Sequence, residues 1–176
     1  NCYYYIRNVW FDRYAKYNTA DKSITPASGK NTDDTYLWRI KKNTDGTVCI
    51  YSKKTQTAAY LTSNAVDAKV LVGKDYAWTL EERTLDGKDG ICIIDGSGSF
   101  SWYTNPNSWG YILMKPFWGA CTWEFQDSGI EVSTGITDIV GEEEKATKQI
   151  YDLSGRRVIK PASGIYVVNG QKQIIK

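Results

Sequence analysis

The residues of this chain that are best suited to bind a ligand are aromatic residues with asparagines close to them in the sequence. Its 176 residues include 7 tryptophans and 13 tyrosines, and no histidine. Without histidine the Ser-His-Asp and Cys-His nucleophilic sites are excluded, and the commonest transition-metal ligand is missing. An aromatic ring can instead stack on the apolar C–H face of a sugar whose hydroxyls bind neighbouring amides. We therefore predict a carbohydrate-binding protein with no catalytic residue, metal or other cofactor.

The best candidate site lies in the third quarter of the chain. Trp102 and Trp109 flank a turn-forming segment that contains Asn105 and Asn107. Such a segment is expected to expose its amides beside the two large rings. Trp118, in a Pro-Phe-Trp-Gly segment, either lines the same edge or covers one end of the fold.

A second candidate site lies near the start of the chain. Trp10, Asp12 and Tyr14 belong to an aromatic run that is interrupted by one acid and one base. We expect this run to form a hairpin loop with stacking rings and a carboxylate.

An enzyme is a weaker interpretation. Glu81 and Glu82 are adjacent, so on a strand they point to opposite faces, which does not suit the paired carboxylates of glycoside hydrolysis. The stronger alternative is a protein-interaction or spacer module. Exposed rings at Trp102 and Trp109 would favour glycan binding, whereas buried rings would favour the interaction module.

The elements that must position these residues are short strands in three copies. Trp38, Trp78 and Trp123 are 40 and 45 residues apart, and each is followed two places later by an apolar residue. This alternation is typical of a strand with one buried face, so the three tryptophans are predicted core residues. Three further strands precede each of them, at residues 4–7, 14–18 and near 24; at 48–51, 60–61 and 70–72; and at 91–94, 102–103 and 111–114. Propellers typically have 4 to 8 blades, so three four-stranded copies favour a closed barrel.

Composition and charge exclude other classes. Hydrophobic residues make up 41% and charged residues 24% of the chain, as in ordinary globular proteins. The net charge of +2 is too small for the usual footprint of nucleic-acid binding. No apolar stretch approaches the roughly 20 residues needed to span a membrane.

The threefold pattern resembles the ricin-type β-trefoil, a lectin-like family, over residues 1–127. The resemblance implies an all-β trefoil and a non-catalytic carbohydrate-binding module whose partner is a glycan. The family closes each copy with Gln-x-Trp, and other residues stand at the Gln position here: Tyr36, Tyr76 and Cys121. The positions that match the family's sugar-binding Asp also differ, and are Arg7, Tyr51 and Ile94. The family's binding residues therefore do not transfer to this chain.

The four cysteines have no C-x-x-C spacing. Cys49 and Cys92 lie inside the first strand of their copies and are predicted to be small buried hydrophobes. Because the first and last strands of a trefoil meet, we predict a disulfide between Cys2 and Cys121, which requires a Cα separation of about 4.4–6.8 Å.

The remaining chain differs in composition. We predict a linker over residues 128–148 and a small β-meander over residues 149–176, with a hairpin turn at its Asn-Gly pair. The run Tyr-Asp-Leu-Ser-Gly-Arg-Arg-Val and the later Gly-Ile-Tyr resemble the C-terminal regions of secreted Bacteroidetes proteins, which are often sorting signals. The resemblance implies an exported bacterial protein, extracellular, at the cell surface or periplasmic, cut from a longer polypeptide.

Overall fold

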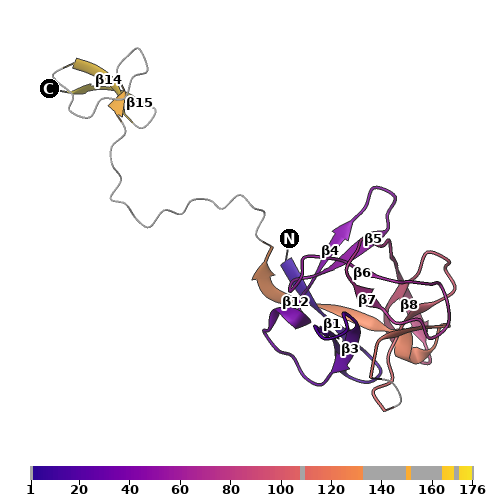
Figure 1. The fold of residues 1–176 in the computed structure, drawn as a ribbon. Helices are drawn as coiled ribbons and strands as arrows, with labels where there is room; N and C mark the ends of the chain where they lie inside the picture. Colours follow the sequence, from indigo (N-terminus) through magenta and orange to yellow (C-terminus); the bar gives the residue numbers. More distant parts are fainter. Residues whose placement is uncertain (1, 108–109, 133–149, 152–163, 169–170, 176) are drawn as a thin grey trace. The chain divides into compact units, whose positions relative to one another are not determined.

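The computed structural model describes residues 2–107, 110–132, 150–151, 164–168 and 171–175 (Figure 1). The chain divides into two compact units, Asn1–Val132 and Ser133–Lys176. The first unit extends past residue 127, where the composition changes, because its last strand continues to Glu131.

The described part of the first unit is built almost entirely from strands. They are β1 (Cys2–Asn8), β2 (Arg13–Tyr17), β3 (Ile24–Ala27), β4 (Trp38–Lys42), β5 (Val48–Ser52), β6 (Ala59–Tyr60), β7 (Leu71–Val72), β8 (Thr79–Leu85), β9 (Lys88–Ile94), β10 (Ser101–Tyr103), β11 (Leu113–Lys115) and β12 (Trp123–Glu131). Two short 3-10 turns precede β4 and β12, namely η1 (Asp34–Tyr36) and η2 (Gly119–Cys121). The four strands predicted for each copy are all present, in the predicted order. None of the helices in the described residues is long and apolar enough to cross a membrane.

The closing tryptophan of each copy pairs with the first strand of the same copy. Trp38 lies opposite Tyr4, Trp78 opposite Val48, and Trp123 opposite Ile91. The three indoles are fully buried, which confirms their prediction as equivalent core residues. Each indole Nε1–H donates a 2.9 Å hydrogen bond to a carbonyl on the second strand of its copy, on Ala15, Ala59 and Trp102 respectively. Trp102 is therefore the threefold equivalent of two alanines.

A ring of backbone hydrogen bonds joins the three copies at one end of the barrel. The amide of Ile24 donates to the carbonyl of Val70 (3.0 Å), Val70 to Ile112 (3.1 Å), and Ile112 to Ile24 (2.8 Å). All three residues are fully buried. At the other side, β1 pairs antiparallel with β12 and closes the barrel. The first unit is thus a β-trefoil, as predicted.

The predicted Cys2–Cys121 disulfide is wrong, because all four cysteines are free. The first and last strands do meet, but their antiparallel register places Cys2 opposite Glu131 and Asn8 opposite Trp123. Cys121 therefore lies near the far end of β1. The prediction that Cys49 and Cys92 are buried is confirmed.

Thiol labelling of the native protein at pH 8 is expected to modify Cys2 and to spare Cys92 and Cys121. Cys2 is half-buried, whereas burial raises the pKa of the Cys92 thiol and raises that of Cys121 to about 12. Both buried thiols therefore stay protonated at pH 8. They should escape labelling, because the thiolate is the reactive species. Mass spectrometry after labelling identifies the modified sites, and unfolding without reductant should expose four reactive thiols. Only two reactive thiols in the unfolded chain would contradict the structure.

The second unit contains a small antiparallel sheet in the order β13 (Ile150–Tyr151), β14 (Gly164–Val168) and β15 (Gln171–Ile175). The β14–β15 hairpin confirms the predicted second hairpin of the meander, with Val168 opposite Gln171. Most of the predicted first hairpin lies outside the described residues.

Candidate functional site

The loop that follows the first strand of each copy contacts the segment before the closing tryptophan of another copy. The amide of Val9 donates to the carbonyl of Thr122 (3.0 Å), and Lys53 donates equivalently to Leu37 (2.8 Å). In the third case the amide of Gly96 donates to the Tyr76 hydroxyl (3.4 Å). We call these contacts, all within the described residues, the first–third, second–first and third–second seams.

Two of the seams are closed by polar contacts. At the second–first seam, Lys53 forms an ion pair with Asp34. At the third–second seam, the Tyr76 hydroxyl also donates to Asn64 Oδ1 (3.1 Å). Neither seam exposes a tryptophan among its described residues.

The first–third seam adds an aromatic contact to its polar ones. The ring of Trp10 lies directly on the backbone of Gly119, since a Cβ atom built there would lie 2.6 and 2.7 Å from Cε3 and Cζ3 of the ring. Real Cβ atoms do not approach other atoms so closely, so only glycine leaves room for the ring. Asn8 anchors this loop, because its fully buried Nδ2 donates to the carbonyls of Ala120 (2.9 Å) and Thr122 (3.2 Å).

Trp10 and Trp118 are the two exposed tryptophans of the described residues, with 44% and 56% of their surface accessible. Trp118 directly precedes Gly119, and the edge-to-face contact between its ring and Tyr103 has a centroid separation of 6.1 Å. We call Trp10, Trp118 and Gly119 the indole platform. The sequence placed these two tryptophans in separate candidate regions, and the fold brings the Trp10 ring onto the residue that follows Trp118.

A carboxylate borders the platform. Asp86 lies in the turn between β8 and β9 with φ of 49°, and its Oδ2 accepts a 2.7 Å hydrogen bond from the amide of Gly119. The Cβ built on Gly119 would lie 3.0 Å from that oxygen. Asp86 is exposed. In the sequence, Asp86 is recognisable only as the first residue of an Asp-Gly turn. It was therefore not predicted as a site residue.

Asp12, a predicted site residue, is held by an arginine. Its Oδ1 accepts a 2.6 Å hydrogen bond from Arg7 Nε, and Arg7 also donates to Glu124 (3.0 Å). The hydrogen bond to Asp12 raises the pKa of the Arg7 guanidinium. The Asp12 side chain is 70% exposed, so one carboxylate oxygen is free to accept a further hydrogen bond.

Two predicted stacking residues are core residues, and their prediction as binding residues is wrong. Trp102 is 0% exposed and packs edge-on against Trp78 and Trp123, with centroids 5.5 and 6.2 Å apart. Tyr14 is 8% exposed, because its ring packs edge-on against Tyr5. The inward faces of β10 and β2 take both rings into the interior.

In the turn after Trp102, the Asn105 side chain makes a hydrogen bond within the turn. Asn105 Oδ1 accepts a 3.1 Å hydrogen bond from the backbone amide of Asn107. Asn105 is half-buried and Asn107 is exposed. Trp109 lies outside the described residues, so its role stays a prediction.

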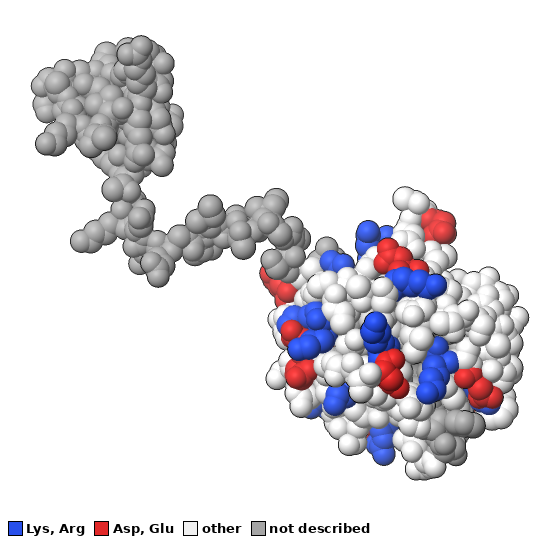
Figure 2. All heavy atoms as spheres, viewed as in Figure 1, with Lys and Arg blue, Asp and Glu red and all other residues white. Residues whose placement is uncertain are grey.

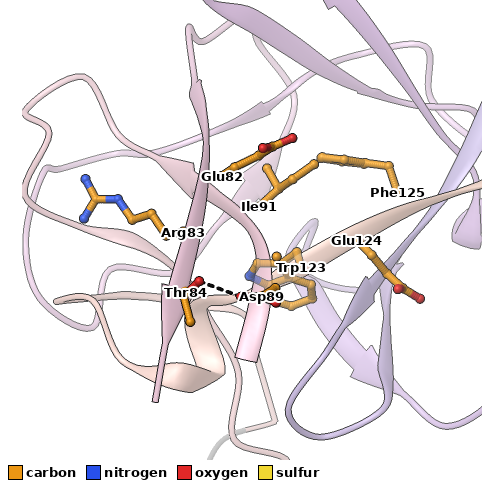
Figure 3. Close-up of a pocket in the computed structure, with 9 residues that line it drawn as sticks. Glu82, Arg83, Thr84, Asp89, Ile91, Trp123, Glu124 and Phe125 are labelled. Atoms are coloured by element: carbon orange, nitrogen blue, oxygen red, sulfur yellow. Dashed lines mark hydrogen bonds between the residues drawn. The ribbon is translucent and has the colours of Figure 1, made fainter. Parts of the chain in front are cut away.

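A larger pocket lies between the β8–β9 hairpin and β12 (Figure 3). It encloses about 550 Å³ over an apolar floor that includes Ile91, Trp123 and Phe125. Glu82 and Arg83 leave β8 on opposite sides (Figure 3). Two of its three carboxylates already accept hydrogen bonds, Asp89 from Thr84 (2.5 Å) and Glu124 from Arg7 (3.0 Å). Only Glu82 lacks a partner among the described residues, so the pocket offers no pair of free acids.

A smaller polar pocket of about 280 Å³ lies in the first copy, lined by Lys16, Asn18, Asn31, Asp33 and Tyr36 among others. The Lys16 ammonium lies 5.4 Å from the centroid of the Tyr36 ring, and that tyrosine is buried. This pocket therefore presents polar groups without an open ring face.

Acidic and basic side chains are interspersed on the face of the first unit shown in Figure 2. Within the described residues no group of three or more Cys, Asp and Glu side chains is placed to hold a metal ion.

No protein-family model matches the sequence, and no curated protein matches it either. Solved structures do resemble the fold. The ricin B-like lectin of Macrolepiota procera, solved in complex with lactose, is 15% identical and superposes with a TM-score of 0.61 over 71% of this chain and 94% of its own. The Rhizoctonia solani agglutinin is 18% identical, with a TM-score of 0.60 over 72% of this chain and 94% of its own.

One similar structure is an enzyme. The GlcNAcα1-4Gal-releasing endo-β-galactosidase of Clostridium perfringens is 13% identical, with a TM-score of 0.58 over 72% of this chain. The match covers 32% of the enzyme's chain, so this chain corresponds to about a third of that protein. At these identities the likeness shows the β-trefoil fold.

Proposed function

We propose that the first unit is a non-catalytic carbohydrate-binding module and that the indole platform is its binding site. The observation that carries this proposal is that the exposed Trp10 ring lies on Gly119, the residue that follows the exposed Trp118, beside the Asp86 carboxylate. The other two seams are closed by polar contacts, so the platform is a departure from the threefold symmetry.

The chemistry of the platform suits a sugar. An exposed indole stacks on the apolar face of a pyranose ring, and carboxylate oxygens accept hydrogen bonds from its hydroxyls. Asp86 has an exposed carboxylate next to the Trp10 ring. Asp12 has an exposed carboxylate in the loop that contains Trp10. The polar pocket of the first copy lacks an open ring face, so we favour the platform over it.

The similar structures support the proposal at the level of the fold. Two are named as a lectin and an agglutinin, and the lectin was solved with lactose. The resemblance of the C-terminal region to secreted Bacteroidetes proteins supports an exported protein, which would meet glycans outside the cytoplasm.

A protein-interaction module is the alternative. The burial of Trp102 favours it, because that ring was one of the two whose exposure would have supported glycan binding. An exposed aromatic pair can also bind a protein, since tryptophan is enriched at the centres of interfaces. Binding experiments with isolated glycans separate the two functions.

The test is calorimetry of the 176-residue chain against a panel of neutral and acidic oligosaccharides and polysaccharides. Removing a stacking ring usually costs about 1 kcal/mol or more, so Trp10→Ala and Trp118→Ala should each weaken glycan binding several-fold. Val66→Ala removes the third large exposed apolar side chain of the described residues and serves as the control with unchanged affinity. If the unmutated chain binds no glycan in the panel, the interaction module is the better function.

A further inference from the structure

We infer that the indole platform selects uncharged glycans and that Asp86 sets this preference. The inference rests on the proposed function and concerns the charge of the ligand. It follows from the ionic partners of the groups around the platform.

Asp86 brings a negative charge to the platform that the described residues leave unpaired. Its Oδ2 accepts the amide of Gly119 at 2.7 Å, whereas no hydrogen bond to Oδ1 and no ion pair to Asp86 is formed within the described part of the chain. The carboxylate and the Trp10 ring border the same spot above Gly119. The carboxylate therefore lies beside the Trp10 ring, and we expect a sugar on the exposed part of that ring to lie close to it.

The arginines around the platform are already engaged. Arg7 bridges Asp12 (2.6 Å) and Glu124 (3.0 Å). Arg83 donates to Glu81 (2.8 Å) and lies over the Phe117 ring, with its guanidinium carbon 3.8 Å from the centroid. Each arginine would have to give up a partner before it could bind an acidic ligand.

Two other cationic residues are close in sequence to the groups around the platform: Arg13 is near Trp10, and Lys88 is near Asp86. Arg13 donates to the carbonyls of Phe11 (3.5 Å) and Asp12 (3.2 Å). Lys88 follows the same turn as Asp86 and pairs across the hairpin with Leu85. Neither forms an ion pair with Asp86 within the described residues.

A carboxylate beside the stacking face discriminates by charge. It accepts hydrogen bonds from the hydroxyls of a neutral sugar, and it repels a uronate, sialate or sulfate placed on the same ring. Two like charges about 5 Å apart cost about a fourfold loss of affinity at the dielectric constant of bulk water and a larger loss at the lower effective dielectric of a protein surface, and added salt screens this repulsion.

The experiment compares matched probes that differ in charge. A sialylated oligosaccharide is tested against its methyl ester, in which the carboxylate is neutral, and a galacturonan oligosaccharide against its methyl-esterified form of equal length. For each pair in which binding is detected, the unmutated chain should bind the neutral probe at least about fivefold more tightly than the acidic probe at low salt. Raising the ionic strength should reduce that ratio.

Asp86→Asn removes the charge with little change in shape. The amide oxygen of asparagine can still accept the Gly119 amide, and asparagine adopts a positive φ readily. The neutral-to-acidic ratio should fall below about twofold while neutral binding persists. Asp45→Asn, in the equivalent turn before β5, where Asp45 bonds Thr47, is the matched control and should leave the ratio unchanged.

The outcomes separate the two proposals. Absence of binding to every probe and every panel glycan overturns the proposed function itself. Equal binding of neutral and acidic probes, tighter binding of the acidic ones, or a preference that Asp86→Asn leaves intact overturns the inference alone. The salt dependence of the unmutated chain decides the matter if the variant does not fold.

Discussion

Replacing Trp102 by alanine is expected to lower the free energy of unfolding by about 3–5 kcal/mol, the range for a large buried aromatic. Trp102 is fully buried and packs edge-on between Trp78 and Trp123. The substitution would leave a cavity that the two neighbouring indoles, each fixed by its own Nε1 hydrogen bond, cannot fill. The equivalent residues in the other two copies are alanines. Their neighbours fill the space around an alanine, whereas the neighbours of Trp102 leave room for an indole.

Denaturant unfolding followed by circular dichroism measures this loss. Trp118→Ala is the matched control, because Trp118 is 56% exposed and its removal should change the free energy of unfolding by less than about 1 kcal/mol. A loss below about 1 kcal/mol for Trp102→Ala would mean that the ring is not in the core, and would restore it as a candidate stacking residue.

Gly119→Ala is expected to weaken glycan binding at least several-fold, because the added methyl group takes the place of the Trp10 ring and crowds the Asp86 carboxylate. The new Cβ would lie 2.6 Å from Cε3 of Trp10 and 3.0 Å from Oδ2 of Asp86. The ring is partly exposed and can swing outward, so we expect the platform to be lost while the fold persists. Calorimetry with the panel glycan that binds best measures the change, and a thermal melt verifies folding.

Gly110→Ala is the matched control for this substitution, since a Cβ atom at Gly110 has open space around it. Its affinity should equal that of the unmutated chain. If Gly119→Ala binds as tightly as Gly110→Ala, the ring of Trp10 does not form part of the binding site.

The strands were predictable because the pattern occurs three times. A single Trp-x-apolar segment is weak evidence, but three segments that are each preceded by an equal set of strands indicate one closed architecture. The register of β1 on β12 was not predictable in the same way. The meeting of the two strands suggested the Cys2–Cys121 bridge, whereas the antiparallel pairing of Cys2 with Glu131 depends on details of closure that no local pattern encodes.

The candidate site was only half predictable. Trp10, Trp118 and Asp12 were identified as site residues from their types, and all three are exposed. Trp102 was misjudged because it stands where the other copies have alanine, so its ring looked surplus to the core. The asymmetric core accommodates one large ring and two methyl groups, which symmetry arguments cannot reveal.

The contact that creates the platform joins residues from opposite ends of the first unit. Trp10 and Gly119 meet only because the first copy follows the third around the barrel. Asp86 lies in the turn between β8 and β9. The Asp-Gly sequence of this turn indicates its backbone conformation but not the contact of the Asp86 side chain with Gly119. A functional site built across a seam between repeats is therefore less visible in sequence than one built inside a repeat.

The most direct test of the binding site is the response of the indole N–H signals in a ¹H–¹⁵N spectrum to the best-binding panel glycan. We expect the signals of Trp10 and Trp118, assigned with single tryptophan-to-phenylalanine variants, to shift on titration. The signals of Trp38, Trp78, Trp102 and Trp123 should stay in place, because these rings are fully buried. Shifts confined to the polar pocket of the first copy, with the Trp10 and Trp118 signals unmoved, would contradict the assignment of the site to the first–third seam.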